Sequence, residues 1–290
     1  MQTLLLPSGA SIPKLGLGTW RLGESRASRA AEVAAVRTAI EIGYRLIDTA
    51  EMYGEGGAEE VVGQAVAEAL RAGDVRRDEL FIVSKVYPHN ASRRGTLQAC
   101  ERSRRRLGLD QIDLYLLHWR GQHPLADTVA AMHALVADRQ IAHWGVSNFD
   151  VDDMQELFAI AALRGGDAKR ACAANQVYFS LSERGAAFSL LPWLCTHGVP
   201  LMAYSPIDQG TLAGHQALAR IGAPLGLSAA QVALAWVAQQ PGVVAIPKAV
   251  KAQHLRENFA AAGITLGTEQ LRLIDRAFPP PQGKTPLAMI

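Results

Sequence analysis

The stretch Leu46-Ile47-Asp48-Thr49-Ala50-Glu51-Met52-Tyr53-Gly54 decides the fold that we expect for this chain. An apolar run stops at a carboxylate, and a tyrosine follows five residues later. Two later apolar runs end in the same way, one at Lys85 and one at His118. In a barrel of parallel strands, the carboxyl ends of the strands meet at one rim, where functional side chains gather. We therefore predict an active site in which Asp48, Tyr53, Lys85 and His118 converge, with Tyr53 at its centre.

Apolar runs alternate with segments of helical periodicity along the whole chain. The expected strands are Leu15–Gly18, Arg45–Asp48, Leu80–Lys85, Ile112–His118, His143–Ser147, Ala173–Val177, Val199–Tyr204 and Val243–Ile246. The expected helices are Ser28–Ile42, Ala58–Arg71, Ser92–Leu107, Pro124–Asp138, Val151–Arg164, Ala187–Thr196, Ser228–Gln239, Ala252–Ala262 and Thr268–Ala277. About eight strand–helix units over 290 residues close a barrel better than they fill a doubly wound sheet. We predict the α/β class and a (β/α)8 TIM barrel that forms a single domain over residues 1–290.

The two ends of the chain carry additions to this repeat. Thr3–Leu6 and Ala10–Ile12, with a turn at Ser8-Gly9, predict a β-hairpin that plugs the bottom of the barrel. The Pro-rich segment after Ala277 predicts a tail across the mouth of the barrel. Gly165-Gly166 predicts a helix-to-strand turn and not a domain linker.

Composition and charge exclude several classes of partner. A net charge of +2 predicts no nucleic-acid partner and no attraction to an anionic membrane. Cys100, Cys172 and Cys195 are far apart and include no Cys-x-x-Cys, which argues against a disulfide framework or a zinc site. The N-terminus lacks a signal-peptide pattern, and no apolar stretch is long enough to span a bilayer. We expect a cytoplasmic protein that is a monomer or a weak dimer.

The four rim residues suit delivery of a proton to an oxygen atom. A free phenol, with a pKa near ~10, is a poor acid at neutral pH, and a neighbouring ammonium lowers that pKa. Lys85 supplies the ammonium, and Asp48 supplies the counter-charge that a buried ammonium needs. His118 adds a nitrogen that holds a carbonyl oxygen or relays a proton. Taken singly, these residues also fit a helix cap, a loop aromatic, an exposed strand end and a structural histidine; their joint placement favours the active site.

Seven stretches of the sequence resemble the aldo-keto reductase family. They are Gly43–Ala50 with Tyr53-Gly54, Ile82–Lys85, Asp113–Trp119, Gly145–Phe149, Asn175–Val177, Ala203–Pro206 and Ile246–Lys248. Each stretch alone is weak, but their order and spacing are highly specific and cover the chain from Gly16 to Asn258. The resemblance implies that Tyr53 is the general acid towards a substrate carbonyl, that Lys85 and Asp48 tune its pKa, and that His118 orients the carbonyl.

The resemblance also implies a nicotinamide cofactor, since no protein side chain supplies a hydride. The matching cofactor positions are Gly18, Thr19, Trp20, Asp48, Ser147, Asn148, Gln176, Tyr204, Ser205, Pro206, Ile207, Gln209, Gly210, Lys248, His254, Glu257 and Asn258. Within this set, Tyr204 would stack under the nicotinamide, the main chain from Ser205 to Gly210 would run along the diphosphate, and Lys248 would lie near the adenosine phosphates. No Gly-x-Gly-x-x-Gly opens a helix, so a Rossmann-type site is not indicated.

Two departures from the family pattern concern the choice of cofactor. His254 stands where arginine is frequent, and Ala249 stands where serine or threonine is frequent. Both changes remove donors for the 2′-phosphate of NADP. Lys248 remains and Lys251 adds charge nearby, so we favour NADPH and keep NADH as the alternative. If His254 contacts the phosphate, cofactor affinity is expected to depend on pH.

The substrate side of the site is predicted to be aromatic and open. The implied pocket residues are Trp20, Tyr53, Tyr87, His118 and Trp119. The connections after Ser147, His118 and Tyr204 look short, which predicts a shallow pocket for small aldehydes. Arg120 either attracts an anionic substrate tail or, as we favour, lies in solvent. Arg120-Gly121 and the tail Gly283–Leu287 resemble a bacterial branch associated with methylglyoxal reduction.

Two other functions are alternatives to carbonyl reduction. The first is a binding module that keeps the cofactor without catalysis, against which the complete set of four rim residues argues. The second is a metal-dependent barrel hydrolase that uses Asp48 and His118. That chemistry needs clustered histidine and carboxylate ligands, and no His-x-His occurs at a strand end. No metal ligand is therefore assigned.

Overall fold

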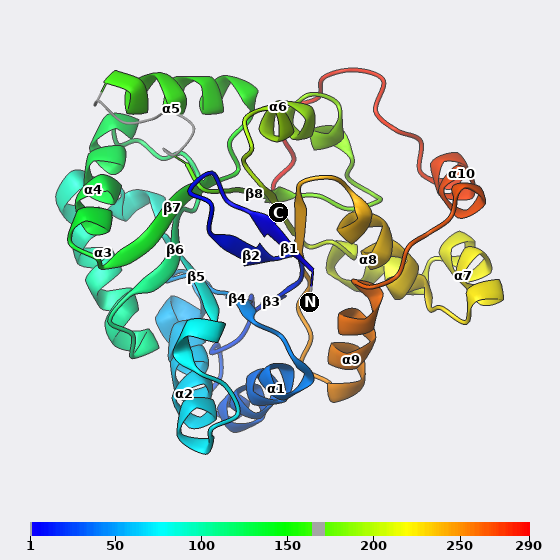
Figure 1. The fold of residues 1–290 in the computed structure, drawn as a ribbon, viewed down its shortest axis with the longest axis horizontal. Coiled ribbons are helices and arrows are strands. Elements are labelled where there is room, and N and C mark those ends of the chain that lie inside the picture. The colour runs from blue at the N-terminus through cyan, green and yellow to red at the C-terminus, as the bar shows by residue number, and fades with distance from the viewer. Residues whose placement is uncertain (1, 164–171) are drawn as a thin grey trace.

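The computed structural model describes residues 2–163 and 172–290, and in this part of the chain eight parallel strands form a barrel inside a ring of helices (Figure 1). The strands are β3 (Gly16–Gly18), β4 (Leu46–Asp48), β5 (Phe81–Val86), β6 (Ile112–Leu117), β7 (Ile141–Ser147), β8 (Asn175–Tyr178), β9 (Leu201–Tyr204) and β10 (Val243–Ile246). Each strand pairs with the next in sequence, and Leu15 bridges Ala245 so that the ends of the sheet meet. The predicted TIM barrel is confirmed.

Alternation along the strands separates an inner core from an outer core. Leu46, Val83, Leu114 and Met202 pack together inside the barrel. Their sequence neighbours, such as Ile47, belong to a second cluster that packs against the helices. Because side chains on a strand point to opposite faces in turn, a residue two positions beyond an inner-core residue also faces the lumen. By this rule, the side chains of the polar residues at the strand ends point into the lumen.

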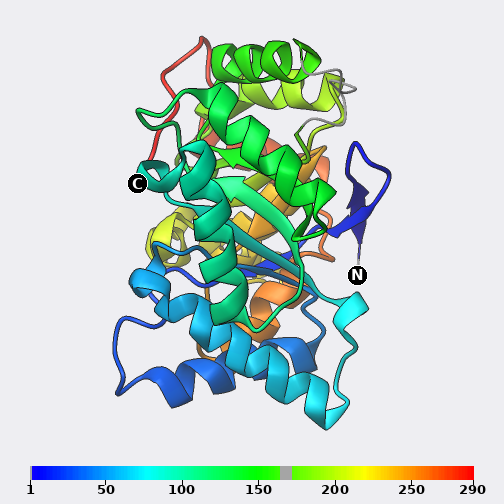
Figure 2. The ribbon, with the colours of Figure 1, turned by 90° about the vertical axis from the view of Figure 1, so that its left-hand side faces the viewer.

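Ten helices are described around the barrel (Figures 1 and 2). They are α1 (Arg29–Ile42), α2 (Gly57–Ala72), α3 (Arg93–Leu107), α4 (Leu125–Ala137), α5 (Val151–Leu163), α6 (Leu190–Thr196), α7 (Gln216–Gly222), α8 (Ala229–Gln239), α9 (Ala252–Ala261) and α10 (Thr268–Ala277). Their ends follow local chemistry. Ser228 begins α8 with a reciprocal capping box to Gln231, and Gly43 ends α1 with a left-handed φ of 119°.

Most expected elements have observed bounds within a few residues, but two expectations are wrong. The connection after Tyr204 is not short, because it runs to α8 and contains α7, which the sequence did not reveal. A helix of seven residues gives too few turns for a clear apolar period. The helix expected from Ala187 begins at Leu190, because residues 185–187 form a separate 3-10 turn. The expected helix end at Arg164 and the turn at 165–166 lie outside the described residues.

The hairpin and the tail occupy opposite ends of the barrel. Strands β1 (Thr3–Leu5) and β2 (Ser11–Pro13) pair in antiparallel fashion and lie across the barrel in Figure 1. Leu6 and Ile12 pack into the inner core, so the hairpin plugs the amino ends of the strands as predicted. In Figure 2 the two chain ends lie on opposite sides of the molecule, which brings the tail to the carboxyl ends of the strands.

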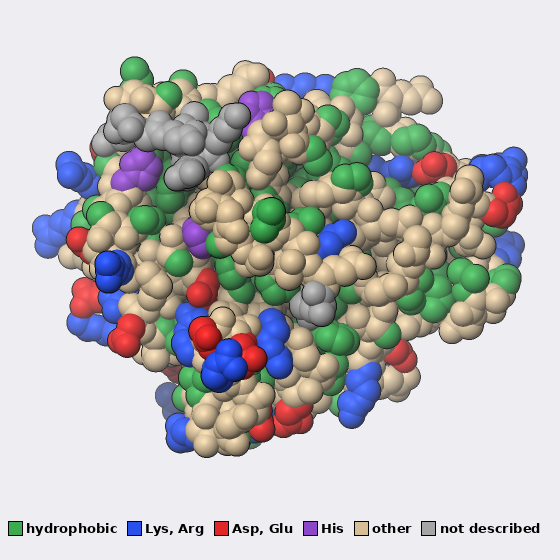
Figure 3. Space-filling view, in the orientation of Figure 1, with side chains coloured by type: hydrophobic (Ala, Val, Ile, Leu, Met, Phe, Trp, Pro, Cys, Tyr) green, Lys and Arg blue, Asp and Glu red, His purple; other side chains and the backbone are tan. Residues whose placement is uncertain are grey.

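The surface on the hairpin side carries charges of both signs. Figure 3 shows basic and acidic side chains next to one another on this face, in the region of α1 and α2. The three cysteines are free, and only Cys195 is exposed. Among the described residues, no single helix has the length and apolar character of a membrane span, although the bent pair 216–225 and 229–239 meets both criteria when taken together.

Replacing Ile12 tests the hairpin as a plug. The Ile12 side chain is fully buried, so Ile12→Ala is expected to lower the free energy of unfolding by about 2–4 kcal/mol. Leu5 in the same hairpin is 68% exposed, and Leu5→Ala is expected to change the free energy of unfolding by less than about 0.5 kcal/mol. Denaturant unfolding followed by tryptophan fluorescence measures both. Equal losses of unfolding free energy in the two variants would contradict the prediction that the hairpin packs into the end of the barrel through Ile12.

Candidate active site

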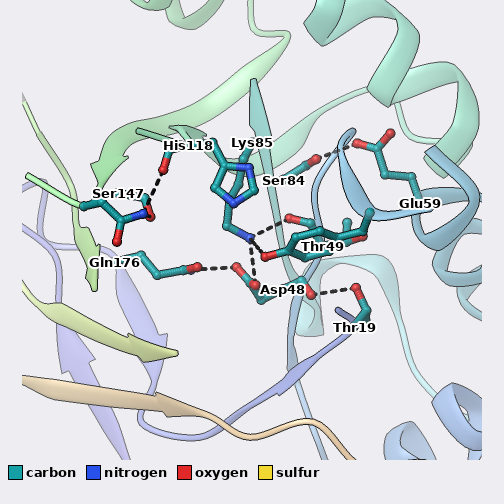
Figure 4. A network of polar contacts seen from close by, with 11 residues as sticks. Thr19, Asp48, Thr49, Glu59, Ser84, Lys85, His118, Ser147 and Gln176 are labelled. Carbon is teal, nitrogen blue, oxygen red and sulfur yellow. Dashed lines mark hydrogen bonds and ion pairs between the residues drawn. The ribbon is translucent and has the colours of Figure 1, made fainter. Parts of the chain in front are cut away.

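A fully buried lysine lies at the centre of the site and contacts three groups (Figure 4). Its Nζ atom is 2.8 Å from Oδ2 of Asp48, 2.9 Å from the carbonyl oxygen of Thr49 and 3.3 Å from the hydroxyl of Tyr53. This lysine is Lys85, and it faces the lumen because it is two residues beyond the inner-core residue Val83. The structure thus brings together the tyrosine, lysine and aspartate that the sequence indicated.

Asp48 is held on both sides by neighbours from distant parts of the chain. Its second carboxylate oxygen accepts a hydrogen bond from Gln176 Nε2 at 2.7 Å, and its carbonyl oxygen accepts one from Thr19 Oγ1 at 2.9 Å (Figure 4). Only 2% of Asp48 is exposed, so these bonds and the ion pair to Lys85 satisfy a carboxylate that water does not reach. Asp48 therefore fixes the lysine in one position.

Tyr53 lies on a tight turn that follows β4. Residues 53–56 form a 3-10 turn in which Gly54 and Gly56 have φ values of 56° and 94°. A Cβ atom at Gly54 would lie 2.8 Å from a main-chain carbon of Gly23, so both the conformation and the close approach call for glycine. The turn brings the phenol back over the lumen, 4.8 Å from Lys85 Nζ to the ring centroid.

The environment sets the protonation states of the tyrosine and the lysine. Burial raises the pKa of Tyr53, and this outweighs the opposing effect of the Lys85 ammonium. Burial lowers the pKa of Lys85, but Asp48 and Tyr53 together raise it above its ordinary value. The sequence argument identified the effect of Lys85 on the phenol and missed the larger effect of burial. Both directions favour a protonated phenol and a charged amine at neutral pH.

His118 completes the group as a neutral imidazole. Burial, and then the charge of Lys85, lowers the pKa of His118 well below the ordinary value near 6.5. Its ring lies edge-on to Tyr53, with centroids 5.6 Å apart, and its Nδ1 atom has no partner among the described residues. A neutral ring next to a charged lysine offers one N–H donor without adding charge. This arrangement suits a hydrogen bond to a carbonyl oxygen.

Asn148 connects the histidine to a further aromatic ring of the site. Its Nδ2 atom donates to the carbonyl oxygen of His118 and to Ser147 Oγ, both at 3.1 Å, and its Oδ1 atom accepts from the Tyr204 hydroxyl at 3.1 Å. Asn148 has a left-handed φ of 60°, which a non-glycine residue adopts only where its surroundings require it. The strand ends β7 and β9 are thereby joined across the rim.

A cavity of about 780 Å³ opens above these residues and extends to β10 and α9. All of the cofactor positions implied by the resemblance line it, as do Tyr53, His118 and Trp119. Lys85 lies beneath its floor. The sequence reasoning missed the lining residues Arg21, Met52, Ala213, Ser228, Ala230, Ile246, Met289 and Ile290. Arg21 and Met52 adjoin residues that were named, whereas no local pattern marks Met289 or Ile290.

One expectation about the substrate side is corrected by the structure, and another agrees with it. Tyr87 is not among the described residues that line the cavity, because its ring packs edge-on behind Trp119, with centroids 5.1 Å apart. Arg120 is exposed, as favoured from the sequence, and its guanidinium bonds Asp153 at 2.9 Å and Glu156 at 2.6 Å, so it is not free for a substrate. The apolar side chains of Trp20, Met52, Trp119, Met289 and Ile290 form the lining near the rim instead.

The lining includes groups that suit a ligand carrying phosphate. The exposed Lys248 and His254 lie at the α9 end of the cavity, far in sequence from the catalytic group. Ser205, Pro206, Ile207, Gln209 and Gly210 also line the cavity, and no atom lies within 4 Å of the position of a Cβ on Gly210. The lining thus combines hydrogen-bonding side chains, open main chain and two cations, which are the groups that a dinucleotide with its phosphates requires.

A buried tyrosine, lysine, aspartate and histidine at the rim of a (β/α)8 barrel, beside a large cavity, form a candidate enzyme active site. A family model described as "Aldo/keto reductase family" matches residues 14–278. The chain belongs to the aldo/keto reductase family, and the resemblance seen in the sequence is confirmed.

Individual relatives agree with this assignment over nearly the full chain. Methylglyoxal reductase YeaE of Escherichia coli is 46% identical over 285 residues, which cover 97% of this chain and 96% of the relative. Glyoxal reductase of Bacillus subtilis is 37% identical over 273 residues, covering 94% and 91%. The crystal structure of an aldo-keto reductase from Klebsiella pneumoniae in complex with NADPH has a TM-score of 0.90, with 47% identity, covering 100% of this chain and 99% of that one.

The lowered pKa of His118 has a consequence for stability in acid. His118 stays neutral in the folded protein, whereas the unfolded chain protonates it below about pH 6.5, so acid favours unfolding. Between about pH 7.5 and 5.5 this effect is expected to cost about 1.4 kcal/mol. Denaturant unfolding of the wild type and His118→Gln at both pH values measures it. The variant should lose less stability than the wild type by that amount; equal losses would contradict a neutral His118.

Proposed function

We propose that this protein reduces small neutral aldehydes and ketones to alcohols with NADPH, and that methylglyoxal is one substrate. The observation that carries the proposal is the Tyr53 hydroxyl, 3.3 Å from the buried Lys85 Nζ, on the lining of a cavity of about 780 Å³. The relatives named for methylglyoxal and glyoxal reduction, and the neighbour solved with NADPH, support the substrate class and the cofactor.

The proposed reaction divides between cofactor and protein. The reduced nicotinamide supplies a hydride to the carbonyl carbon when it is bound. As the C=O π bond breaks, its electron pair moves to the oxygen, which takes the proton of the Tyr53 hydroxyl. The phenolate that remains lies beside Lys85, whose charge stabilises it. His118 would hold the carbonyl oxygen near the phenol through its N–H group, and the ring of Tyr204, which lines the cavity, would support the nicotinamide.

The rim of the cavity supports a small and uncharged substrate. Its described lining includes the apolar side chains of Trp20, Met52, Trp119, Met289 and Ile290, and the guanidinium of Arg21, which also lines the cavity, lies over the Trp20 ring at 4.6 Å from its centroid. Arg120, the cation closest to Trp119 in sequence, is already bound by two carboxylates. A 2-oxoaldehyde of few carbon atoms needs only a carbonyl hydrogen bond and apolar contact, which this lining offers.

The phenol is tested by removing its hydroxyl. Tyr53→Phe is expected to lower kcat for methylglyoxal with NADPH by roughly 10²–10⁴-fold, because the proton donor is lost while the ring remains. Oxidation of NADPH followed by its absorbance measures the rate, and fluorescence titration measures cofactor binding. Tyr115→Phe, which removes a buried hydroxyl outside the lumen, is the matched control. Comparable rates in wild type and Tyr53→Phe would exclude the phenol as acid. A wild type that binds NADPH yet reduces no carbonyl in a panel would favour the binding-module alternative.

Lys248 is proposed to recognise the 2′-phosphate that distinguishes NADPH from NADH. Lys248→Met is expected to lower kcat/KM for NADPH by roughly tenfold or more, because it removes a charge contact worth at least about 1.4 kcal/mol, and to leave the value for NADH within about threefold. Steady-state kinetics with both cofactors measure the change. The matched control is Lys251→Met, an exposed lysine outside the described lining. Equal losses with NADPH and NADH would contradict the assignment.

A further inference from the structure

One hydrogen bond outside the catalytic group ties β8 to the main chain in the middle of the cavity. Tyr178, the last residue of β8, donates its hydroxyl to Oδ1 of Asp208. Tyr178 is 8% exposed, and its ring stacks on that of its strand partner Tyr204, with centroids 5.8 Å apart and planes 17° apart. Burial, and then the bond to Asp208, raises the pKa of Tyr178, so the hydroxyl remains a donor.

The segment from Ser205 to Gly210 has an unusual backbone. Ser205, Asp208 and Gln209 have φ values of 48°, 50° and 50°, and Gly210 has 99°. L side chains rarely adopt this left-handed region, and they remain there only where the surroundings hold them. Two main-chain hydrogen bonds, Asp208 to Ser205 at 2.9 Å and Gly210 to Ile207 at 3.0 Å, shape the turn. Among the described residues, the bond from Tyr178 is the only side-chain hydrogen bond to this segment.

The same bond controls the position of a charge. Asp208 is the only charged residue between Ser205 and Gly214. Its neighbours Ile207 and Gln209 line the cavity, whereas Asp208 is absent from the described lining. A carboxylate turned towards the cavity here would repel a diphosphate that follows this main chain. The hydroxyl of Tyr178, which is also absent from the described lining, gives that carboxylate a partner.

We propose that Tyr178 and Asp208 are positioning residues for the cofactor. Their hydrogen bond fixes the left-handed main chain Ser205–Gly210 and holds the Asp208 carboxylate out of the path of the diphosphate. The proposal rests on the proposed NADPH-dependent function for the identity of the ligand. The bond stabilises residues 205–210 in the protein without cofactor as well, so this effect can be measured in the absence of NADPH.

The first arm of the test uses hydrogen–deuterium exchange of the full chain without cofactor. Tyr178→Phe keeps the ring stack on Tyr204 and removes the donor. Amides of residues 208–212 are expected to exchange about tenfold faster than in the wild type, which corresponds to ~1.4 kcal/mol of lost protection. Asp208→Ala should give the same increase, and the double variant no more, since both changes remove one interaction. Asp208→Asn keeps an acceptor oxygen and should retain slow exchange.

The second arm measures binding of NADPH by quenching of tryptophan fluorescence and by stopped-flow dissociation. Tyr178→Phe is expected to raise Kd about tenfold, mainly through faster dissociation, because the segment loosens and the carboxylate is released. Adding Asp208→Asn to Tyr178→Phe removes the charge and should recover part of the affinity. A merely structural role for Tyr178 would not predict recovery from a second substitution.

Tyr115→Phe is the matched control for both arms, since it removes a buried hydroxyl far from the segment. Exchange of residues 208–212 in Tyr178→Phe within twofold of the wild type overturns the hold on the segment, whatever the substrate is. Faster exchange without a change in Kd overturns the role towards the cofactor. If the wild type binds NADPH but reduces no carbonyl, the proposed function is wrong. Hydrogen–deuterium exchange and the Kd for NADPH still test the role of the Tyr178–Asp208 bond in that case.

Discussion

The ion pair between Lys85 and Asp48 is the interaction on which the site depends. Both side chains are within a few per cent of complete burial, so each charge has lost its water and needs the other. Removal of one partner from such a pair typically costs about 3–5 kcal/mol, because the remaining charge is left without compensation. The pair also sets the chemistry around it: the lysine charge favours a phenolate at Tyr53 and disfavours a proton on His118. The charge states of the group therefore follow from burial together with this ion pair.

Barrel closure is the constraint that assembles everything else around this pair. Gln176 reaches Asp48 across 128 residues of sequence because β4 and β8 face each other over the lumen. The rim also concentrates backbone strain, since Asn148, Ser205, Asp208 and Gln209 all have positive φ. Strain of this kind is retained where the surrounding structure holds it, and it gathers at functional sites. Here a stable barrel holds the strained main chain that lines the cavity.

The features that the sequence predicted correctly are those in which a local sequence pattern directly determines the geometry. The inward position of Lys85 follows from strand alternation, and the order of strands follows from the repeat of strand–helix units. Sequence reasoning worked less well for properties that depend on the surroundings. The raised pKa of Tyr53 comes from burial by residues of several elements, and Tyr87 lies behind Trp119 because two loops pack together. The extended connection after Tyr204 escaped notice because its helix is short.

The sequence by itself determined the class of fold, the alternation along each strand that directs Asp48 and Lys85 into the lumen, and the identity of the chemical groups available there. These follow from periodicity and from residue type, which are local properties. Only the tertiary structure decided the protonation states, the pairing of Arg120 with carboxylates, the approach of Met289 and Ile290 to the cavity, and the bond from Tyr178 to Asp208. Each of these features depends on contacts between residues that are distant in sequence, and no local pattern specifies which distant residues meet.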